Sequence, residues 1–315
     1  MKTKNKIIIV SGPTATGKTS LALKLAKDFQ AEILNFDSLL FYKELNIGTA
    51  KPTPQELAQT MHHMVNTHSI FNPINAADFI QLATPLIQET HKKGKTIILV
   101  GGSGFYLQAL LKGMYNSPTT SEKLRQRSDQ LYKTQGIGPF RDILKQNDFS
   151  SFERYHENDH YRIRRAVEHF WMTGQEFSKS RQEKNLDPTN YPYIKYQWDM
   201  LHLHLDIPKD QHWDIILERT NQMIKMGLIQ EVQELLKNGA TGNEKPLQSI
   251  GYKETLAFLK GEIKDETSLI ERISINTRQL AKAQRTWFKK HKKLCYNALK
   301  DIDEIHEVSH NFIKS

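Results

Sequence analysis

Residues 12–19 read Gly-Pro-Thr-Ala-Thr-Gly-Lys-Thr, an octapeptide that directly follows the apolar run Ile7–Val10. It fits the spacing G-x-x-x-x-G-K-S/T, in which a strand leads into a glycine-rich loop and the loop into a helix. The backbone N–H groups of such a P-loop face inward, and the next helix presents its positive end. A diphosphate, or a nucleotide such as ATP, is therefore predicted to bind there. We expect the binding residues to be Gly12, Pro13, Thr14, Ala15, Thr16, Gly17, Lys18 and Thr19.

Two side chains of this loop have distinct chemical roles. Lys18 would neutralise the outer phosphate, and Thr19 would offer its hydroxyl to a Mg²⁺ ion. Mg²⁺ is thus the predicted cofactor, and Thr19 is its predicted ligand from the protein.

The surrounding sequence predicts an α/β fold. Ile7–Val10 is entirely apolar and β-branched, as in a strand covered on both faces, and Ser20–Phe29 has the spacing of a helix. Two further strands, Ala31–Phe36 and Thr96–Val100, alternate with a helix at Asp78–Lys93. Such alternation gives right-handed crossovers and ligand loops at the carboxyl edge of the strands. We expect a P-loop NTPase-like parallel sheet core flanked by helices.

The character of the sequence changes from about Ser117. Helical and highly charged patterns follow at 119–135 and 159–173, and the alternation from Leu201 to Leu205 then predicts a return to the sheet. Later helical patterns lie at 209–226, 228–238, 250–260 and 265–291. The predicted segments are 1–116 as the first part of the P-loop core, 117–195 as a helical insertion, and 196–315 as the return to the core with a helical C-terminal region.

Composition sets the class of protein. A chain of 315 residues with 38% hydrophobic and 25% charged residues is ordinary for a globular enzyme. A net charge of +9 is compatible with a polyanionic partner. The single cysteine, Cys295, excludes an intramolecular disulfide framework and a cysteine-rich zinc site. Because no stretch reads as a signal peptide or a membrane span, we expect a cytoplasmic protein without membrane partners.

Acidic groups are scarce at the predicted ligand edge. A P-loop enzyme that hydrolyses a nucleotide carries an acidic residue after an apolar strand, but Thr96–Val100 is followed by Gly-Gly-Ser. Asp37 ends a strand on that edge, and it can serve as a Mg²⁺ ligand, a helix N-cap or a general base. Ser103 either closes a tight turn or donates to a phosphate. His62-His63 has no matching ligand cluster, which favours a structural role over a metal site.

Two basic segments favour a nucleic-acid partner. The first, Tyr161–Arg165, opens a helix of the predicted insertion. The second, Arg278–Lys293, contains seven basic residues and no acidic one, with Trp287 and Phe288 interleaved. Aromatic rings between cations can stack on bases, although each segment alone is equally consistent with a solvated helix face.

These segments together resemble the tRNA dimethylallyltransferase family. The matching stretches are GPTATGKT (12–19), DSLLFYKELNIGTAKP (37–52), HHM (62–64), VGGSGFYLQALLKG (100–113), NDHYRIRRAVE (158–168), SIGYKE (249–254) and TRQLAKAQRTWF (277–288). They follow the family's order over nearly the whole chain. Members of that family transfer an isopentenyl group to N6 of the adenosine just 3′ of the tRNA anticodon. The resemblance implies a prenyltransferase that uses tRNA and dimethylallyl diphosphate, and we expect a monomer.

The resemblance also implies roles for individual residues. The P-loop would grip the diphosphate of dimethylallyl diphosphate with Mg²⁺, so no carboxylate is needed to position water. Ser103 and Arg219 would hold the bridging oxygen, and Asp37 would be the general base; these three are the predicted catalytic residues. The family's tRNA contacts map to Asp37, Ser38, Leu39, Leu40, Ser103, Arg125, Tyr161, Arg162, Ile163, Arg164, Arg165, Gln248, Ser249, Ile250, Gly251, Tyr252, Lys253, Lys282 and Arg285.

The chain departs from the family pattern at three places, and other functions compete. Ser103 stands where threonine is usual, Leu39-Leu40 replaces a pair of smaller residues, and Ala283 occupies a usually basic position. The alternatives are an adenylate isopentenyltransferase acting on free nucleotide, a P-loop small-molecule kinase and a non-enzymatic RNA-binding protein. The basic segments favour tRNA over the first two, and the catalytic candidates favour an enzyme over the third.

Overall fold

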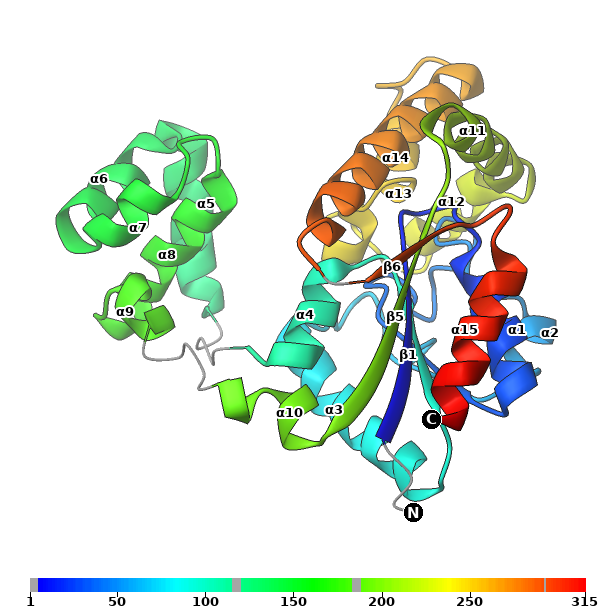
Figure 1. Ribbon diagram of the computed structural model, residues 1–315. Coiled ribbons are helices and arrows are strands. Elements are labelled where there is room, and N and C mark those ends of the chain that lie inside the picture. The colour runs from blue at the N-terminus through cyan, green and yellow to red at the C-terminus, as the bar shows by residue number, and fades with distance from the viewer. Residues whose placement is uncertain (1–4, 115–119, 183–187, 292) are drawn as a thin grey trace. The chain divides into compact units, whose positions relative to one another are not determined.

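The computed structural model describes residues 5–114, 120–182, 188–291 and 293–315 (Figure 1). The chain packs as two units. The core unit comprises Met1–Leu111 and Tyr196–Ser315, and the helical unit comprises Lys112–Lys195. Residue 196 is also where the sequence predicts the return to the sheet. The predicted boundary between residues 116 and 117 lies outside the described residues.

In the described part of the core unit, six parallel strands form one sheet in the order β3-β2-β4-β1-β5-β6. Strand β1 lies between β4, where Ile7 is opposite Ile97, and β5, where Asn5 is opposite Trp198. The edge strand β6 was not predicted from the sequence. The strands are β1 (Asn5–Ser11), β2 (Glu32–Asn35), β3 (His62–His63), β4 (Ile97–Gly101), β5 (Trp198–Asp206) and β6 (Leu294–Asn297).

Helices cover both faces of this sheet (Figure 1). On one face, Ile8 and Val10 of β1 pack in a buried cluster with Leu25 of α1 and Ile305 of α15. Side chains alternate along a strand, so Ile7, which is also fully buried, points to the other face. The predicted α/β fold is therefore confirmed. The covering helices are α1 (Lys18–Phe29) and α15 (Ile302–Lys314) on one face, with α3 (Ala76–Lys92) and α4 (Gly104–Lys112) on the other.

A second apolar cluster joins the later helices of the core unit to the segment after β2. Tyr42 and Leu45 pack there against Val232, Tyr252 and Ile273, all of them buried. Among the described residues, no helix is both long and apolar enough to cross a membrane. The helices of this cluster are α11 (Lys209–Lys225), α12 (Leu228–Lys237), η2 (Lys245–Gln248), α13 (Tyr252–Leu259) and α14 (Glu266–Phe288), whereas the short helix α2 (Pro54–Leu57) lies between β2 and β3 in the chain.

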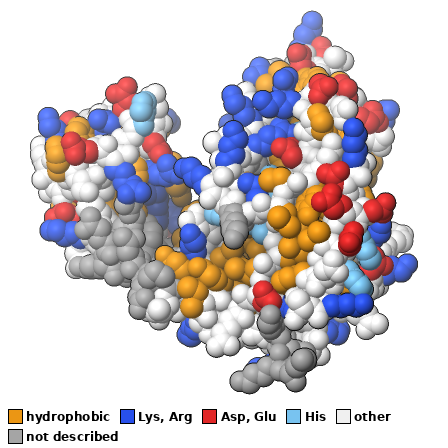
Figure 2. Space-filling model, in the orientation of Figure 1, with side chains coloured by type: hydrophobic (Ala, Val, Ile, Leu, Met, Phe, Trp, Pro, Cys, Tyr) orange, Lys and Arg blue, Asp and Glu red, His pale blue; other side chains and the backbone are white. Residues whose placement is uncertain are grey.

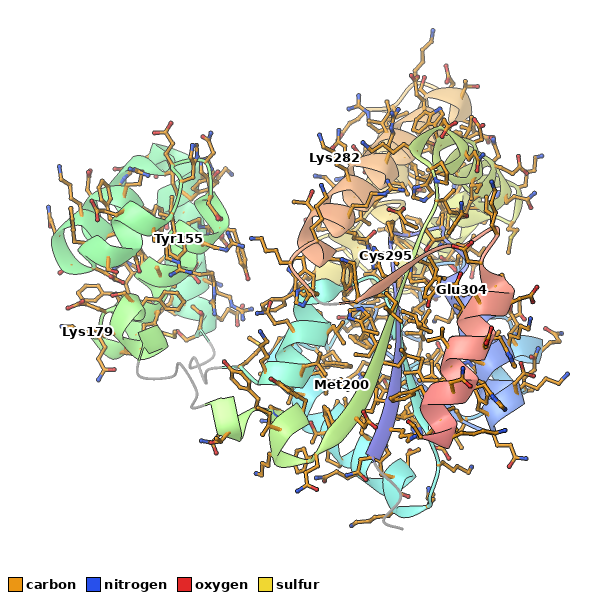
Figure 3. All side chains as sticks on the ribbon, viewed as in Figure 1. Tyr155, Lys179, Met200, Lys282, Cys295 and Glu304 are labelled. Atoms are coloured by element: carbon orange, nitrogen blue, oxygen red, sulfur yellow. The ribbon has the colours of Figure 1, made fainter. Side chains whose placement is uncertain are left out.

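The helical unit has its own core. Phe140 and Leu144 of α6 pack with Ile163 and Val167 of α8, and Tyr155, labelled in Figure 3, belongs to the same cluster. The helices are α5 (Glu122–Gln135), α6 (Gly138–Asn147), α7 (Phe149–Arg154), α8 (His160–Thr173), α9 (Phe177–Gln182), η1 (Pro188–Asn190) and α10 (Pro192–Lys195). The sequence predicted α5 and α8, whose charged faces repeat at helical spacing.

A buried carboxylate fastens β2 to its neighbours. Glu32 accepts from His63 Nε2 at 2.8 Å, from Thr90 Oγ1 at 2.9 Å and from Lys95 Nζ at 3.0 Å. Burial raises the pKa of Glu32, but the hydrogen bonds from His63, Lys95 and Thr90 outweigh it and bring that pKa to about 2. His62 Nδ1 bonds to the carbonyl of Thr60 at 2.9 Å. The His62-His63 pair therefore has structural partners.

Replacing Glu32 by glutamine should lower the free energy of unfolding by about 1–3 kcal/mol at pH 7, because a buried charged acceptor is lost. The side chain is only 6% exposed. Since the pKa is depressed in the folded state, the stabilisation is present above the ordinary value of 4.5 and is lost as the pH falls towards 2. Urea unfolding of both proteins between pH 7 and pH 3 measures the difference. A difference that stays constant with pH would contradict this account.

Candidate active site

The phosphate loop lies between β1 and α1 and has a backbone that requires glycine at its start. At Gly12 φ is +156°, and a Cβ there would lie 2.4 Å from the carbonyl oxygen of Leu205. Gly17 precedes the helix with φ +75°. Inside the loop, Thr16 Oγ1 donates to the carbonyl of Pro13 at 2.9 Å. The loop is thus a tight turn closed by its own side chains.

The N-terminus of α1 is left without a protein cap. Gly17 provides no side-chain hydrogen bond, and the first turn of α1 contains no acidic residue. The first N–H groups of a helix have no acceptor within it, and the helix dipole makes this end positive. This end of α1 therefore suits an anion such as a diphosphate.

Two cations and one carboxylate influence one another at this loop. Lys18 Nζ donates to the carbonyl of Pro13 at 2.6 Å. Burial lowers the pKa of Lys18 to about 8, with the charge of Asp37 raising it and that of Arg219 lowering it. Burial also lowers the pKa of Arg219, again against the charge of Asp37. The structure thus brings together Lys18, Asp37 and Arg219, which come from three separate parts of the sequence.

Asp37 and Ser103 lie in neighbouring loops. Leu39 N–H donates to Asp37 Oδ1 at 3.2 Å, and Asp37 N–H donates to Asn35 Oδ1 at 2.9 Å, so the turn after β2 is fixed by its own side chains. Ser103 Oγ accepts from the N–H of Ser38 at 3.3 Å. Strands β2 and β4 are adjacent, with Asn35 opposite Val100, which explains why their loops meet.

The donor set at the loop fits a Mg²⁺ ion that is shared with a substrate. Among the described residues no group of three or more His, Cys, Asp or Glu side chains converges as a metal cage. Mg²⁺ usually takes one or two protein ligands and completes its shell with water and substrate phosphate. Thr19, in the first turn of α1 beside the predicted diphosphate site, is compatible with such a partial shell.

The predicted tRNA-contact residues of the core unit differ in exposure. Gln248, Lys253 and Lys282 are exposed, and Lys282 lies on α14 (Figure 3), where Lys and Arg side chains gather in Figure 2. Leu39, Leu40, Ser249 and Ile250 are half-buried. Tyr252 is fully buried, Gly251 is buried beside it, and Tyr252 OH donates to Glu231 at 2.6 Å. The Tyr252 ring therefore packs the core, and contact of these positions with tRNA stays a prediction.

Arg285 is engaged inside the core unit. Its Nη2 lies 2.7 Å from Asp206 Oδ1 and also contacts His212 Nδ1 at 2.7 Å, and its side chain is only 16% exposed. Its predicted contact with tRNA is not tested by this arrangement, but the guanidinium already has partners in the chain.

Of the predicted tRNA-contact residues of the helical unit, Arg125 lies on α5 and the others lie in the first half of α8. Arg125 and Tyr161 are exposed, and Arg162 pairs with Asp159 at 2.6 Å. Arg164 pairs with Asp129 and covers the ring of Tyr132 at 4.8 Å, and Arg165 pairs with Glu168 at 2.9 Å. Ile163 is 1% exposed and packs in the unit's core. The exposed face of this segment is thus basic and aromatic.

Sequence reasoning missed three polar residues around the loop. Gln284 and His212 bond to Thr14, and Asp206 pairs with Arg285. Asp206 ends β5 at the ligand edge, and an acidic residue at the carboxyl end of a predicted strand could have been recognised as a site residue from the sequence. Gln284 and His212 lie inside helices, and nothing in the helical spacing indicates that their side chains reach the loop.

Comparison with known proteins identifies relatives over most of the chain. A family model described as IPP transferase matches residues 40–291. The chain is 40% identical to tRNA dimethylallyltransferase 2 of Geotalea uraniireducens over 91% of this chain and 90% of that one. It is 37% identical to the tRNA dimethylallyltransferase of Geobacter sulfurreducens, over 91% and 90% of the two chains.

Two solved structures share the fold. A tRNA isopentenylpyrophosphate transferase from Bacillus halodurans superposes with a TM-score of 0.69 at 30% identity, covering 99% of this chain and 97% of that chain. A eukaryotic dimethylallyltransferase acting on tRNA superposes with a TM-score of 0.80 at 26% identity, covering 98% of this chain and 79% of that one.

Proposed function

Because the chain belongs to the IPP transferase family, we propose that it transfers the dimethylallyl group of dimethylallyl diphosphate to N6 of an adenosine in tRNA. The similarity to its relatives identifies the chain as a tRNA prenyltransferase. The identity of the donor and the position of the acceptor adenosine are what we propose. We propose the adenosine 3′-adjacent to the anticodon as the acceptor. One observation carries the proposal: two cations and a carboxylate act on one another beside an uncapped phosphate loop.

The loop and the two cations would stabilise the leaving group. As the bond between the allylic carbon and the bridging oxygen breaks, negative charge grows on the diphosphate. Lys18, Arg219 and the first N–H groups of α1 would stabilise that charge, and their mutual influence beside the loop supports this role. The hydroxyl of Ser103 would donate to the bridging oxygen. When bound at Thr19, Mg²⁺ supplies further positive charge to the diphosphate.

Asp37 would accept the proton that the adenine amine loses. The lone pair of that amine is delocalised into the ring, so the amine is a weak nucleophile until a base takes its proton. The new C–N bond forms, the C–O bond breaks, and the proton moves to the Asp37 carboxylate, so charge and atoms balance. Such help from a positioned base is worth about 10²–10⁴ in rate.

The basic surfaces would hold the tRNA. The acceptor base must leave its stack to reach the loop, which costs a few kcal/mol that backbone contacts have to repay. Exposed Lys282, Lys253, Arg125 and Arg162 are suited to contact phosphates, and exposed Tyr161 to stack on a base. We propose that the anticodon stem-loop is the part bound, that the protein acts as a monomer and that it works in the cytoplasm.

One assay tests the proposal against its alternatives. The protein is incubated with Mg²⁺, dimethylallyl diphosphate and either unmodified tRNA or AMP, and the products are weighed by mass spectrometry. We expect tRNA to gain the mass of one dimethylallyl group and AMP to remain unchanged. Modified AMP alone would favour the adenylate isopentenyltransferase. Phosphoryl transfer from ATP to a small molecule, with no modified tRNA, would favour the kinase.

A further inference from the structure

Two side chains from different helices hold the peptide groups on both sides of Thr14 in the phosphate loop. The N–H of Thr14 donates to Gln284 Oε1 of α14 at 2.8 Å. The carbonyl of Thr14 accepts from His212 Nε2 of α11 at 2.8 Å. Both helices follow the helical unit in the sequence, so the shape of an N-terminal loop is fixed by residues from the other end of the chain.

Arg285 determines which nitrogen of His212 carries the hydrogen. Arg285 Nη2 donates to His212 Nδ1 at 2.7 Å, and a guanidinium cannot accept, so Nδ1 must be unprotonated. Nε2 then carries the hydrogen and donates it to Thr14. Arg285 is fixed in turn by Asp206, since its Nε donates to both carboxylate oxygens at 2.9 and 3.0 Å. A directed series of hydrogen bonds thus runs from β5 to the loop.

Fixing the carbonyl of Thr14 also fixes the N–H of Ala15. Among the described residues every peptide bond is trans, and in a trans unit the C=O and the following N–H point in opposite directions. The N–H of Ala15 therefore points away from His212. Ala15 has φ +62°, a left-handed conformation that disfavours any residue with a Cβ. The peptide group that the bond from His212 fixes is the one that directly precedes this left-handed residue.

Gln284 also connects the phosphate loop to the loop that carries Ser103. Its Nε2 donates to the carbonyl of Gly102 at 3.1 Å. A Cβ at Gly102 would lie 2.5 Å from that Nε2, so the close approach depends on the glycine. The Gln284 side chain thus holds the phosphate loop and the Ser103 loop, which bind the diphosphate in the proposed function, at a fixed separation.

We propose that His212 and Gln284 are positioning residues for the diphosphate. They hold the Thr14 peptide so that the N–H of Ala15 points at the bound diphosphate, and Gln284 keeps Ser103 at a set distance from it. Neither side chain touches the reacting atoms; each acts through the loop. This inference rests on the diphosphate site of the proposed function but not on the identity of the acceptor.

Binding of inorganic pyrophosphate tests the inference without any tRNA. Titration calorimetry in the presence of Mg²⁺ would compare the protein with His212→Ala, Gln284→Ala and the control Gln279→Ala, an exposed position on the same helix. We expect His212→Ala and Gln284→Ala each to weaken pyrophosphate binding about 10-fold, the value of one misplaced hydrogen bond to a charged group. Gln279→Ala should bind as the unaltered protein does.

A second change separates positioning from general destabilisation. Adding Ala15→Gly to His212→Ala should recover part of the pyrophosphate affinity, because glycine adopts positive φ freely. Melting temperatures identify any variant that does not fold. Gln284→Met, which keeps the side-chain volume, then replaces Gln284→Ala. Unchanged pyrophosphate affinity in the folded variants, or an equal loss in Gln279→Ala, would overturn the inference.

Steady-state kinetics distinguish this inference from the proposed function. With tRNA as acceptor, the KM for dimethylallyl diphosphate should rise about 10-fold in His212→Ala while tRNA affinity stays unchanged. If the variants lose pyrophosphate binding but no variant or parent protein modifies tRNA, the inference stands and the proposed function fails. If tRNA is modified with wild-type KM throughout, the function stands and the inference fails.

Discussion

Replacing Asp37 by asparagine is expected to lower the single-turnover rate of dimethylallyl transfer by about 10²–10⁴-fold, with tRNA affinity unchanged. Asparagine retains the oxygen that accepts the N–H of Leu39, so the turn after β2 should keep its shape. It cannot take a proton from the adenine amine, so the loss isolates the base function. Rapid-quench kinetics with saturating substrates measure the rate, and filter binding measures the affinity.

Two outcomes would contradict the role of Asp37. A near-normal single-turnover rate in Asp37→Asn would exclude it as the base. A large loss of tRNA affinity with an unchanged rate would make it a binding residue. Asp28→Asn is the matched control, since Asp28 lies in the same core unit and pairs with His306 at 3.1 Å, apart from the residues of the candidate site.

Replacing Lys18 by methionine should lower kcat/KM for dimethylallyl diphosphate by about 10²–10³-fold, because the positive charge that would stabilise the diphosphate leaving group is lost. The melting temperature should hold or rise. Burial has already lowered the pKa of Lys18 to about 8, which means that the folded protein disfavours its charge. A methionine of similar length removes that penalty and keeps the packing.

The control for Lys18 is Lys24→Met, an exposed lysine on the same helix. It should change neither kcat/KM nor the melting temperature. A Lys18→Met protein that melts lower but retains its kcat/KM would show that Lys18 supports the fold and not the reaction. The pyrophosphate affinity of Lys18→Met, measured by titration calorimetry, independently tests whether the Lys18 charge contributes to diphosphate binding.

The part of the site that lies at strand ends could be predicted from the sequence. The phosphate loop is local, because its glycines, lysine and threonine lie within eight residues. Asp37 and Ser103 follow buried strands, and parallel strands present their carboxyl ends at one edge. The structure places both residues at that edge, with Ser103 bonded to Ser38.

The part of the site that comes from helices could not be predicted from spacing. Arg219 was assigned through a family resemblance, because nothing in the pattern of α11 shows that it approaches Lys18. Gln284 and His212 make long-range hydrogen bonds to a loop some 200–270 positions earlier. Such contacts depend on how α11 and α14 pack on the sheet, which the periodicity of a helix does not encode.

The C-terminal elements show two different reasons for a missed prediction. Strand β6 has four residues, Leu294–Asn297, too few for an alternating pattern to stand out. Helix α15 did carry a signal, since Ile302, Ile305 and Phe312 recur at helical spacing and pack towards the sheet. No element was predicted after the long helix at 265–291, which in the structure ends at Phe288.

The strand order has a consequence for how the enzyme is made. Strand β1 leaves the ribosome early, but β5, one of its two neighbours in the sheet, is synthesised much later. The N–H of Thr14 likewise cannot form its hydrogen bond until Gln284 has been synthesised. At about 5–20 residues per second, residue 284 follows residue 14 by roughly 10–60 s. During that interval the nascent chain carries the octapeptide without the contacts that shape it. The proposed diphosphate site is therefore assembled late in synthesis, and a stalled chain has the motif but not the contacts that shape the loop.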